Sequence, residues 1–188
     1  MAQPAAKYIS EKEYLGFERN APGKHEYYKG EIFAMSGASF KHNVIEKNLR
    51  GELYNFLKGR KCTEFGSNLR IHGPPNTLYT YPDIIIMCDE PVFIDNEFDT
   101  IINPAVIIEI LSPSTANYDR GAKFELYREI ESLHEYILID SSSVHVVNYT
   151  RNNDSTWTLS ETKNSEDNLT IHTIGFTILL SEIYAGAW

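Results

Sequence analysis

Residues 81–87 read YPDIIIM, and residues 103–111 read NPAVIIEIL. Both stretches are short, rich in β-branched side chains and bounded by polar loops, which predicts two strands buried on both faces. Pro82 stands at the start of the first strand, where a missing backbone N–H is tolerated. Each stretch also carries a carboxylate, Asp83 in the first and Glu109 in the second. We therefore expect these strands to form the apolar centre of a sheet.

The sequence on either side predicts further helices and strands. Apolar side chains repeat at helical spacing in residues 39–57, and a capping signal at Ser10 begins a shorter helix. The predicted helices are 8–18, 39–57, 118–130 and 181–188; the predicted strands are 25–28 with 31–35 as a hairpin, 62–66, 69–73, 135–140, 143–149, and 157–161 with 168–173 as a late hairpin. Helices that flank a central sheet indicate an α/β or α+β fold. We see no internal repeat or domain boundary, so a single domain is predicted over 1–188, with 1–9 as a loose N-terminal tail.

The composition favours a soluble globular protein, since 42% of the residues are hydrophobic and 12% aromatic. No apolar run approaches the roughly 20 residues that cross a bilayer, and residues 1–14 lack the apolar core of a signal peptide. A cytoplasmic protein with no membrane partner is therefore expected. Cys62 and Cys88 are too few for a disulfide framework or a structural zinc site, and we expect both to be buried free thiols.

The net charge of −9 argues against a nucleic-acid partner, because phosphate contacts need Lys and Arg. Residues 41–70 soften this objection, since they carry seven basic and three acidic side chains and are therefore +4. The basic residues of this segment are Lys41, Lys47, Arg50, Lys58, Arg60, Lys61 and Arg70. They could meet a phosphate backbone, or they could simply form a solvated helix face.

Glu109 lies in the run AVIIEIL, whose other six residues are apolar. A lone buried carboxylate costs several kcal/mol or takes up a proton, so it needs a partner such as a metal or a lysine. If the strand of Asp83 is the neighbour, the two strands lie about 4.8 Å apart, and their carboxylates can share one Mg²⁺. Such an ion ionises bound water and shields the charge of a phosphate under attack. The alternatives are that Asp83 forms a turn and that Glu109 pairs with an arginine.

Several further motifs resemble those of one family. YPD is followed by IEILSPST, DRGAK and HEYILID, and YKGEIFAMSGAS, KHNVIEKNL and EIY occur in the rest of the chain. In these motifs the chain resembles the Uma-two family of restriction-endonuclease-like proteins, which belongs to the PD-(D/E)xK nuclease superfamily. The resemblance covers about residues 10–184. EILSPST with DRGAK downstream is its most specific part.

The resemblance implies a restriction-endonuclease-like mixed sheet flanked by helices. It also implies that Mg²⁺ or Mn²⁺ is held by Asp83, Glu109 and the backbone carbonyl of Ile110, and that DNA phosphodiester bonds are hydrolysed by an activated water. The chain departs from the superfamily at position 111, where Leu111 replaces the usual lysine. Lys123 of DRGAK is then the expected catalytic lysine. The alternative is an exposed helix lysine paired with Asp119 at i−4.

Two alternative functions are also consistent with the sequence. Leu111 and the acidic net charge fit a degenerate nucleic-acid-binding or accessory protein that kept the nuclease fold, and a hydrolase of another phosphoester is a third possibility. A homodimer is expected because cutting two strands usually needs two sites. Minor candidates for the site are His42 and Glu46 on the helix, Glu31 in the hairpin, and Ser112 with Ser114, which we interpret as a strand exit.

Overall fold

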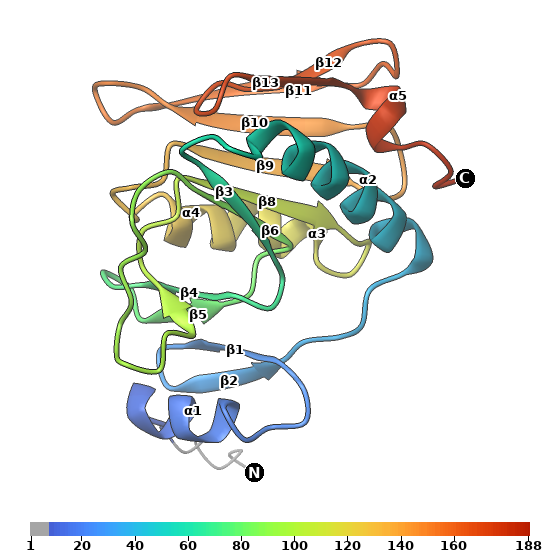
Figure 1. Cartoon of the computed structure of the whole chain (residues 1–188). Coiled ribbons are helices and arrows are strands. Elements are labelled where there is room, and N and C mark those ends of the chain that lie inside the picture. Colours follow the sequence, from blue (N-terminus) through green and yellow to red (C-terminus); the bar gives the residue numbers. More distant parts are fainter. Residues whose placement is uncertain (1–7) are drawn as a thin grey trace.

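A six-stranded mixed sheet runs through the middle of the structure, a computed structural model that describes residues 8–188 (Figure 1). Its strand order is β11-β10-β9-β8-β6-β3. The strands are β11 (Trp157–Thr162), β10 (Val146–Arg151), β9 (Glu135–Asp140), β8 (Val106–Leu111), β6 (Ile84–Met87) and β3 (Thr63–Gly66). β8 pairs in parallel with β9 and antiparallel with β6, and all six of its residues are buried. The two sequence stretches that predicted the sheet are therefore neighbours at its centre.

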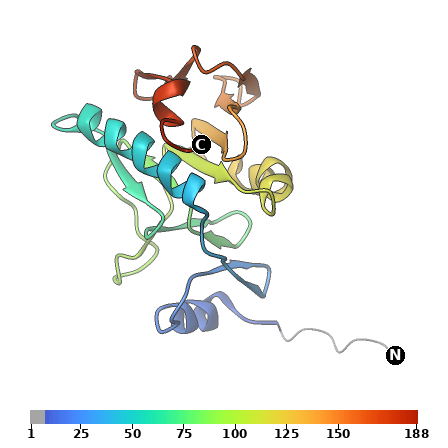
Figure 2. The same ribbon diagram turned by 90° about the vertical axis from the view of Figure 1, so that its right-hand side faces the viewer.

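Each face of this sheet is covered by helical segments. Helix α2 (Phe40–Leu57) packs against one face through Ile45, Leu49 and Leu53, which recur at helical spacing and are fully buried. Ser39 is the N-cap of this helix, and its side chain accepts a hydrogen bond from the backbone N–H of His42 at 3.2 Å. In Figure 2 the chain rises from the N-terminal hairpin directly into α2. No helix within residues 8–188 is long and apolar enough to span a membrane.

The segment after β8 covers the other face, and it is less regular than the single helix predicted for 118–130. It consists of α3 (Ala116–Tyr118), a π-helical turn at Asp119–Lys123, and α4 (Phe124–Tyr127). The prediction of one helix over 118–130 was therefore wrong in its start, its end and its regularity. A π turn holds one extra residue per turn, which shifts the side chains that follow it around the helix axis.

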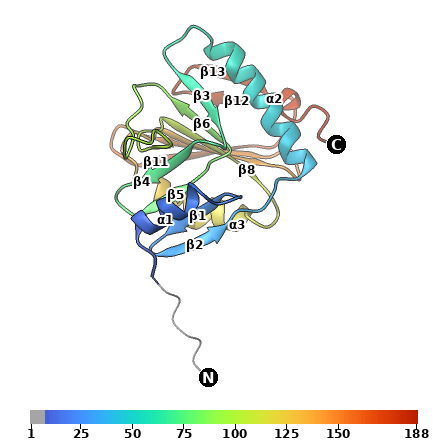
Figure 3. The ribbon, with the colours of Figure 1, turned by 60° about the horizontal axis from the view of Figure 1, so that its bottom comes forward.

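A second sheet of five strands lies beside the first in the order β2-β1-β5-β4-β7. Its strands are β1 (His25–Tyr28), β2 (Glu31–Ala34), β5 (Leu78–Thr80), β4 (Arg70–Gly73) and β7 (Thr100–Ile101). Helix α1 (Glu11–Glu18) begins with the predicted capping box between Ser10 and Glu13 and lies next to the β1–β2 hairpin (Figure 3). Ile9, which the sequence placed in the tail, donates a 3.0 Å hydrogen bond to Gly30, whereas residues 1–7 of that predicted tail lie outside the described residues.

The C-terminal strands pair differently from the prediction. β11 pairs with β10, while β12 (Asn168–Ile171) forms a hairpin with β13 (Phe176–Leu179), followed by α5 (Leu180–Ile183). The predicted hairpin of 157–161 with 168–173 is therefore wrong. Strand β13 buries Phe176 and Ile178, and this alternation allows it to cover the core beside α2.

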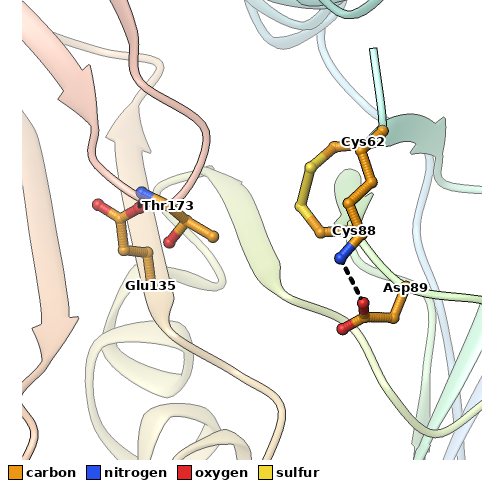
Figure 4. Close-up of a disulfide and its surroundings, with 6 residues drawn as sticks. Cys62, Cys88, Asp89, Glu135 and Thr173 are labelled. Carbon is orange, nitrogen blue, oxygen red and sulfur yellow. Dashed lines mark hydrogen bonds and ion pairs between the residues drawn. A yellow bond between two sulfur atoms is a disulfide. The ribbon is translucent and has the colours of Figure 1, made fainter.

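Cys62 and Cys88 form a disulfide, so the prediction of two free thiols was wrong (Figure 4). The reason lies in the strand register. Because Thr63 of β3 pairs with Met87 of β6, the two cysteines stand directly opposite each other where this antiparallel pair ends. They are 26 positions apart in the sequence, and no local pattern reports such pairing.

Candidate active site

Asp83 and Glu109 meet where β6 and β8 run side by side. Asp83 comes directly before β6, and the register that pairs Ile84 with Ile108 places it beside Glu109. The backbone N–H of Asp83 lies 3.4 Å from Glu109 Oε2. Asp83 Oδ2 accepts hydrogen bonds from the backbone N–H of Ile110 at 2.7 Å and from His42 Nε2 at 3.1 Å. Two fixed donors therefore orient the Asp83 carboxylate.

Glu109 is 5% exposed, and its partners are a tyrosine and a lysine. Its Oε1 accepts a 2.9 Å hydrogen bond from the Tyr127 hydroxyl and lies 2.9 Å from Lys123 Nζ. Burial raises the pKa of Glu109 to about 8, and the nearby Asp83 adds to this, although the Lys123 ammonium opposes it. The pairing with an arginine considered from the sequence does not occur among these contacts.

Lys123 is buried, with 5% of its surface exposed, so the interpretation as an exposed helix lysine is wrong. Its Nζ lies 2.9 Å from Glu109, 3.0 Å from Glu26 and 3.5 Å from Asp119. Burial acts to lower the pKa of Lys123, but the carboxylates around it outweigh this and hold the pKa well above its ordinary value. Lys123 is therefore an ammonium ion at neutral pH.

Glu26 is the member of this cluster that the sequence did not indicate. It lies on β1, its side chain is 13% exposed, and it accepts a hydrogen bond from the hydroxyl of Thr80. The sequence offered Glu31 of the same hairpin instead, but Glu31 is exposed and does not line the cavity. The only available signal was the hairpin motif itself, which does not distinguish between its two glutamates.

Helix α2 brings His42 and Glu46 to the same place. His42 contacts Asp83, as described above; burial acts to lower the pKa of His42, but the hydrogen bond to Asp83 outweighs it, so the pKa is raised. Burial and the proximity of Asp83 raise the pKa of Glu46. Glu46 lies 3.6 Å from Arg50 and lines the cavity, so it is not a purely surface residue.

These groups line a cavity of about 460 Å³ between α2, the β1–β2 hairpin and the turn after β8. Ser112 also lines it, but its hydroxyl is 2.9 Å from that of Ser114 and 3.1 Å from that of Thr115, as expected for a strand-exit turn. Among residues 8–188, five carboxyl groups (Glu26, Glu46, Asp83, Glu109 and Asp119) and two lysines, Lys24 and Lys123, line this cavity. A negative excess of this kind favours a cation.

The donor set fits a hard divalent ion. Within residues 8–188, Asp83 Oδ1 accepts no hydrogen bond, and Glu109 Oε2 accepts only the long contact from Asp83. The strand register places Pro82 opposite Ile110, and proline has no N–H to donate to the carbonyl there. No group of three His, Cys, Asp or Glu side chains in the described chain could by itself hold a metal. Two carboxylates, a carbonyl and water are nevertheless a donor set typical of Mg²⁺.

The basic segment 41–70 is not one free patch. Arg70 is buried and donates to Tyr81 and Thr100, so it cannot reach a phosphate. Arg50 lies 3.0 Å from Glu64, and Lys61 lies 2.7 Å from Asp89. Several of the seven positive charges are therefore already matched by carboxylates of this chain.

The sequence and the fold are similar to those of several known proteins. A sequence model of the Uma2 family, described as "Putative restriction endonuclease", matches residues 11–181. Two proteins of Synechocystis sp., both named only as uncharacterized, are similar: slr1290 is 38% identical over 95% of this chain and 92% of its own, and sll1609 is 37% identical over 86% and 91%. The crystal structure of "a putative nuclease belonging to DUF820" from Anabaena variabilis superposes with a TM-score of 0.78 over 96% of this chain and 99% of that one. At 17% identity this last likeness shows the fold alone.

Proposed function

The chain belongs to the Uma2 family, and we propose that it is a nuclease that hydrolyses phosphodiester bonds of DNA with the help of Mg²⁺ or Mn²⁺. The observation that carries this proposal is the contact of Glu109 with both Asp83 and Lys123 in one cavity. The carboxylates come from neighbouring strands and the ammonium from a separate turn. Packing alone would not bring these charges together, since burying them is unfavourable unless they are paired or hold an ion.

Asp83, Glu109 and the carbonyl of Ile110 are the groups that would hold the cation. When bound there, the ion would supply a water of lowered pKa and would shield charge on the phosphate. The hydrogen bonds from the Ile110 N–H and from His42 keep one oxygen of Asp83 in place, so that the other remains directed to the cavity. Burial of Glu109 excludes water from competing for its carboxylate.

In this proposal Lys123 plays the role of the catalytic lysine that the superfamily has at position 111. Leu111 is 1% exposed and packs in the apolar cluster that also contains Tyr127, so it contributes only to the core. Lys123 reaches the Glu109 carboxylate from the π turn instead. A fixed ammonium at this point would stabilise the negative charge that develops on the phosphoryl oxygens. This arrangement supports the catalytic interpretation over a degenerate accessory protein.

A homodimer is part of the proposal, because cutting both strands of a duplex usually needs two sites. Light scattering during size-exclusion chromatography measures the mass directly, against 21.5 kDa for one chain. A mass of one chain at working concentration would contradict this part of the proposal.

The decisive test incubates single- and double-stranded DNA and RNA with the protein, with Mg²⁺, Mn²⁺ or a chelator. Cleavage of DNA that needs the ion and disappears in Asp83→Ala is expected. The matched control is Asp89→Ala, because Asp89 lies just beyond the other end of β6 and its side chain is 78% exposed. Binding without cleavage by the wild type would favour the accessory protein. Hydrolysis of a small phosphodiester but of no nucleic acid would favour a hydrolase of another phosphoester.

A further inference from the structure

Lys123 contacts a second carboxylate, which belongs to a different sheet. Glu26 belongs to β1 of the five-stranded sheet, whereas Glu109 belongs to β8 of the six-stranded sheet. Their Oε1 atoms lie 3.0 and 2.9 Å from Lys123 Nζ. The ammonium group therefore bridges the two sheets at the edge of the cavity that Glu26 also lines.

We infer that Glu26 is a positioning residue for the Lys123 ammonium, an inference that rests on the proposed function of this site. An ammonium group has three donors on a flexible four-carbon stem, so one carboxylate does not fix its direction. With Glu109 and Glu26 each within hydrogen-bonding distance, two of the donors are assigned. The third is left for the weaker contact with Asp119 at 3.5 Å or for a ligand in the cavity.

Glu26 is itself held in place. The hydroxyl of Thr80, on the neighbouring strand β5, donates to the same Glu26 oxygen that contacts Lys123. Thr80 is fully buried, so this hydrogen bond is shielded from water. The chain of contacts runs from Thr80 through Glu26 and Lys123 to Glu109. Through these contacts the N-terminal sheet fixes the position of the proposed catalytic lysine.

Glu26 also acts through its charge. Glu109 would share its electrons with a bound cation and would then attract Lys123 less strongly, since its charge would be partly neutralised. Glu26 is not among the groups that would hold the ion, so it continues to hold the ammonium in the same place. Glu109 would therefore bind the cation, and Glu26 would hold the Lys123 ammonium in place.

The competing interpretation is that Glu26 only ties the two sheets together. The test compares Glu26→Gln and Glu26→Asp with Glu135→Gln. Glu135 is a fully buried glutamate that accepts from Asn148 and from two backbone N–H groups, and it is not in the cavity. It therefore reports what the loss of a buried carboxylate does by itself. Three quantities are measured on each folded variant: kcat and KM for DNA cleavage, Mn²⁺ affinity by calorimetry, and the hydrogen-exchange rate of the Lys123 ammonium.

The exchange rate is read by nuclear magnetic resonance on protein with ¹⁵N-labelled lysine, and the signal is assigned by its absence in Lys123→Met. Glu26→Gln should lower kcat by about 10- to 100-fold, with KM and Mn²⁺ affinity nearly unchanged, as is usual when a residue that orients a catalytic group is lost. It should also speed exchange of the ammonium, and Glu26→Asp should restore part of both. Glu135→Gln should change neither.

An exchange rate and a kcat that Glu26→Gln leaves at wild-type values would overturn the inference, as would equal changes in Glu135→Gln. If the wild type cleaves nothing with any ion, the proposed function fails, but the ammonium signal still decides whether Glu26 positions Lys123. The two failures are therefore distinguishable.

Discussion

Replacing Lys123 with Met removes the ammonium that three buried carboxylates share. Methionine keeps a long, unbranched apolar stem, so the packing of the stem is largely preserved. The side chains of Glu109, Glu26 and Asp119 are 6%, 13% and 7% exposed and lie within 3.5 Å of Lys123 Nζ. Because water reaches these carboxylates so little, it cannot replace the lost ammonium.

Removing one partner of a buried ion pair destabilises a protein by about 3–5 kcal/mol, which is the loss expected for Lys123→Met. The matched control is Lys163→Met. Lys163 Nζ lies 2.8 Å from Glu161, but the two side chains are 62% and 43% exposed, so the loss there should be about 0–1 kcal/mol. The substitution and the distance are nearly the same in both variants, and burial is the difference.

The loss in free energy of unfolding caused by Lys123→Met should depend on pH. Burial already raises the pKa of Glu109 to about 8 and also raises the pKa of Asp119, and without the ammonium both should rise further. Carboxyl groups whose pKa is raised in the folded state stabilise it at low pH and lose that contribution as pH rises through the folded pKa. Up to the wild-type pKa of Glu109, about 8, both proteins lose this contribution in parallel, so the variant should fall further below the wild type mainly as the pH rises above about 8.

Urea unfolding in chelator at pH 6 and pH 9 measures this for the wild type and both variants. A loss in Lys123→Met no larger than that in Lys163→Met would refute the reasoning, and so would a deficit that shrinks with rising pH. In the cleavage assay, Lys123→Met should slow the reaction by about 10²–10³-fold, the usual effect of removing one group that stabilises the transition state. Mn²⁺ binding should be largely retained, because Lys123 is not among the groups that would hold the ion.

Three further predictions concern other groups. Because burial raises the pKa of Glu109 to about 8, Mn²⁺ binding should release more protons at pH 7 than at pH 9, which calorimetry in two buffers of different ionisation enthalpy measures; release that does not change with pH would contradict it. Reducing the disulfide between Cys62 and Cys88, which closes a loop of 26 residues, should lower the free energy of unfolding by about 3–4 kcal/mol, with the double alanine variant in oxidant as control. Lys47→Gln should reduce the salt dependence of DNA binding by about one phosphate contact. Arg70→Gln, at a buried site, should instead lower the melting temperature. The reverse pattern would show that the basic segment is not a phosphate surface.

Two carboxylates of the candidate site could be predicted from the sequence because each of them stands out against its own surroundings. Glu109 lies in an apolar run, and Asp83 opens another, so both are conspicuous without any knowledge of the fold. Their adjacency required only that the two most apolar strands pair, which they do. Lys123 was found through a motif rather than through physical reasoning, and its burial could not be foreseen in a segment with several charged residues.

Other features depend on contacts between distant segments. Glu26 alternates with buried Tyr27 in an ordinary short strand, and only the docking of the second sheet brings it to Lys123. The disulfide and the pairing of β11 with β10 likewise depend on which strands become neighbours. Local sequence does not specify that choice, because a strand with one apolar face can pair with several partners.

The sequence by itself determined the local elements and the two central strands. Capping at Ser10 and Ser39, the helical spacing in α2 and the apolar character of β6 and β8 are properties of neighbouring residues, and backbone hydrogen bonding and burial act on them directly. Only the tertiary structure decided which charges share one cavity. Buried carboxylates and an ammonium are stable only together, and their meeting depends on how two sheets and a π turn pack across long stretches of chain.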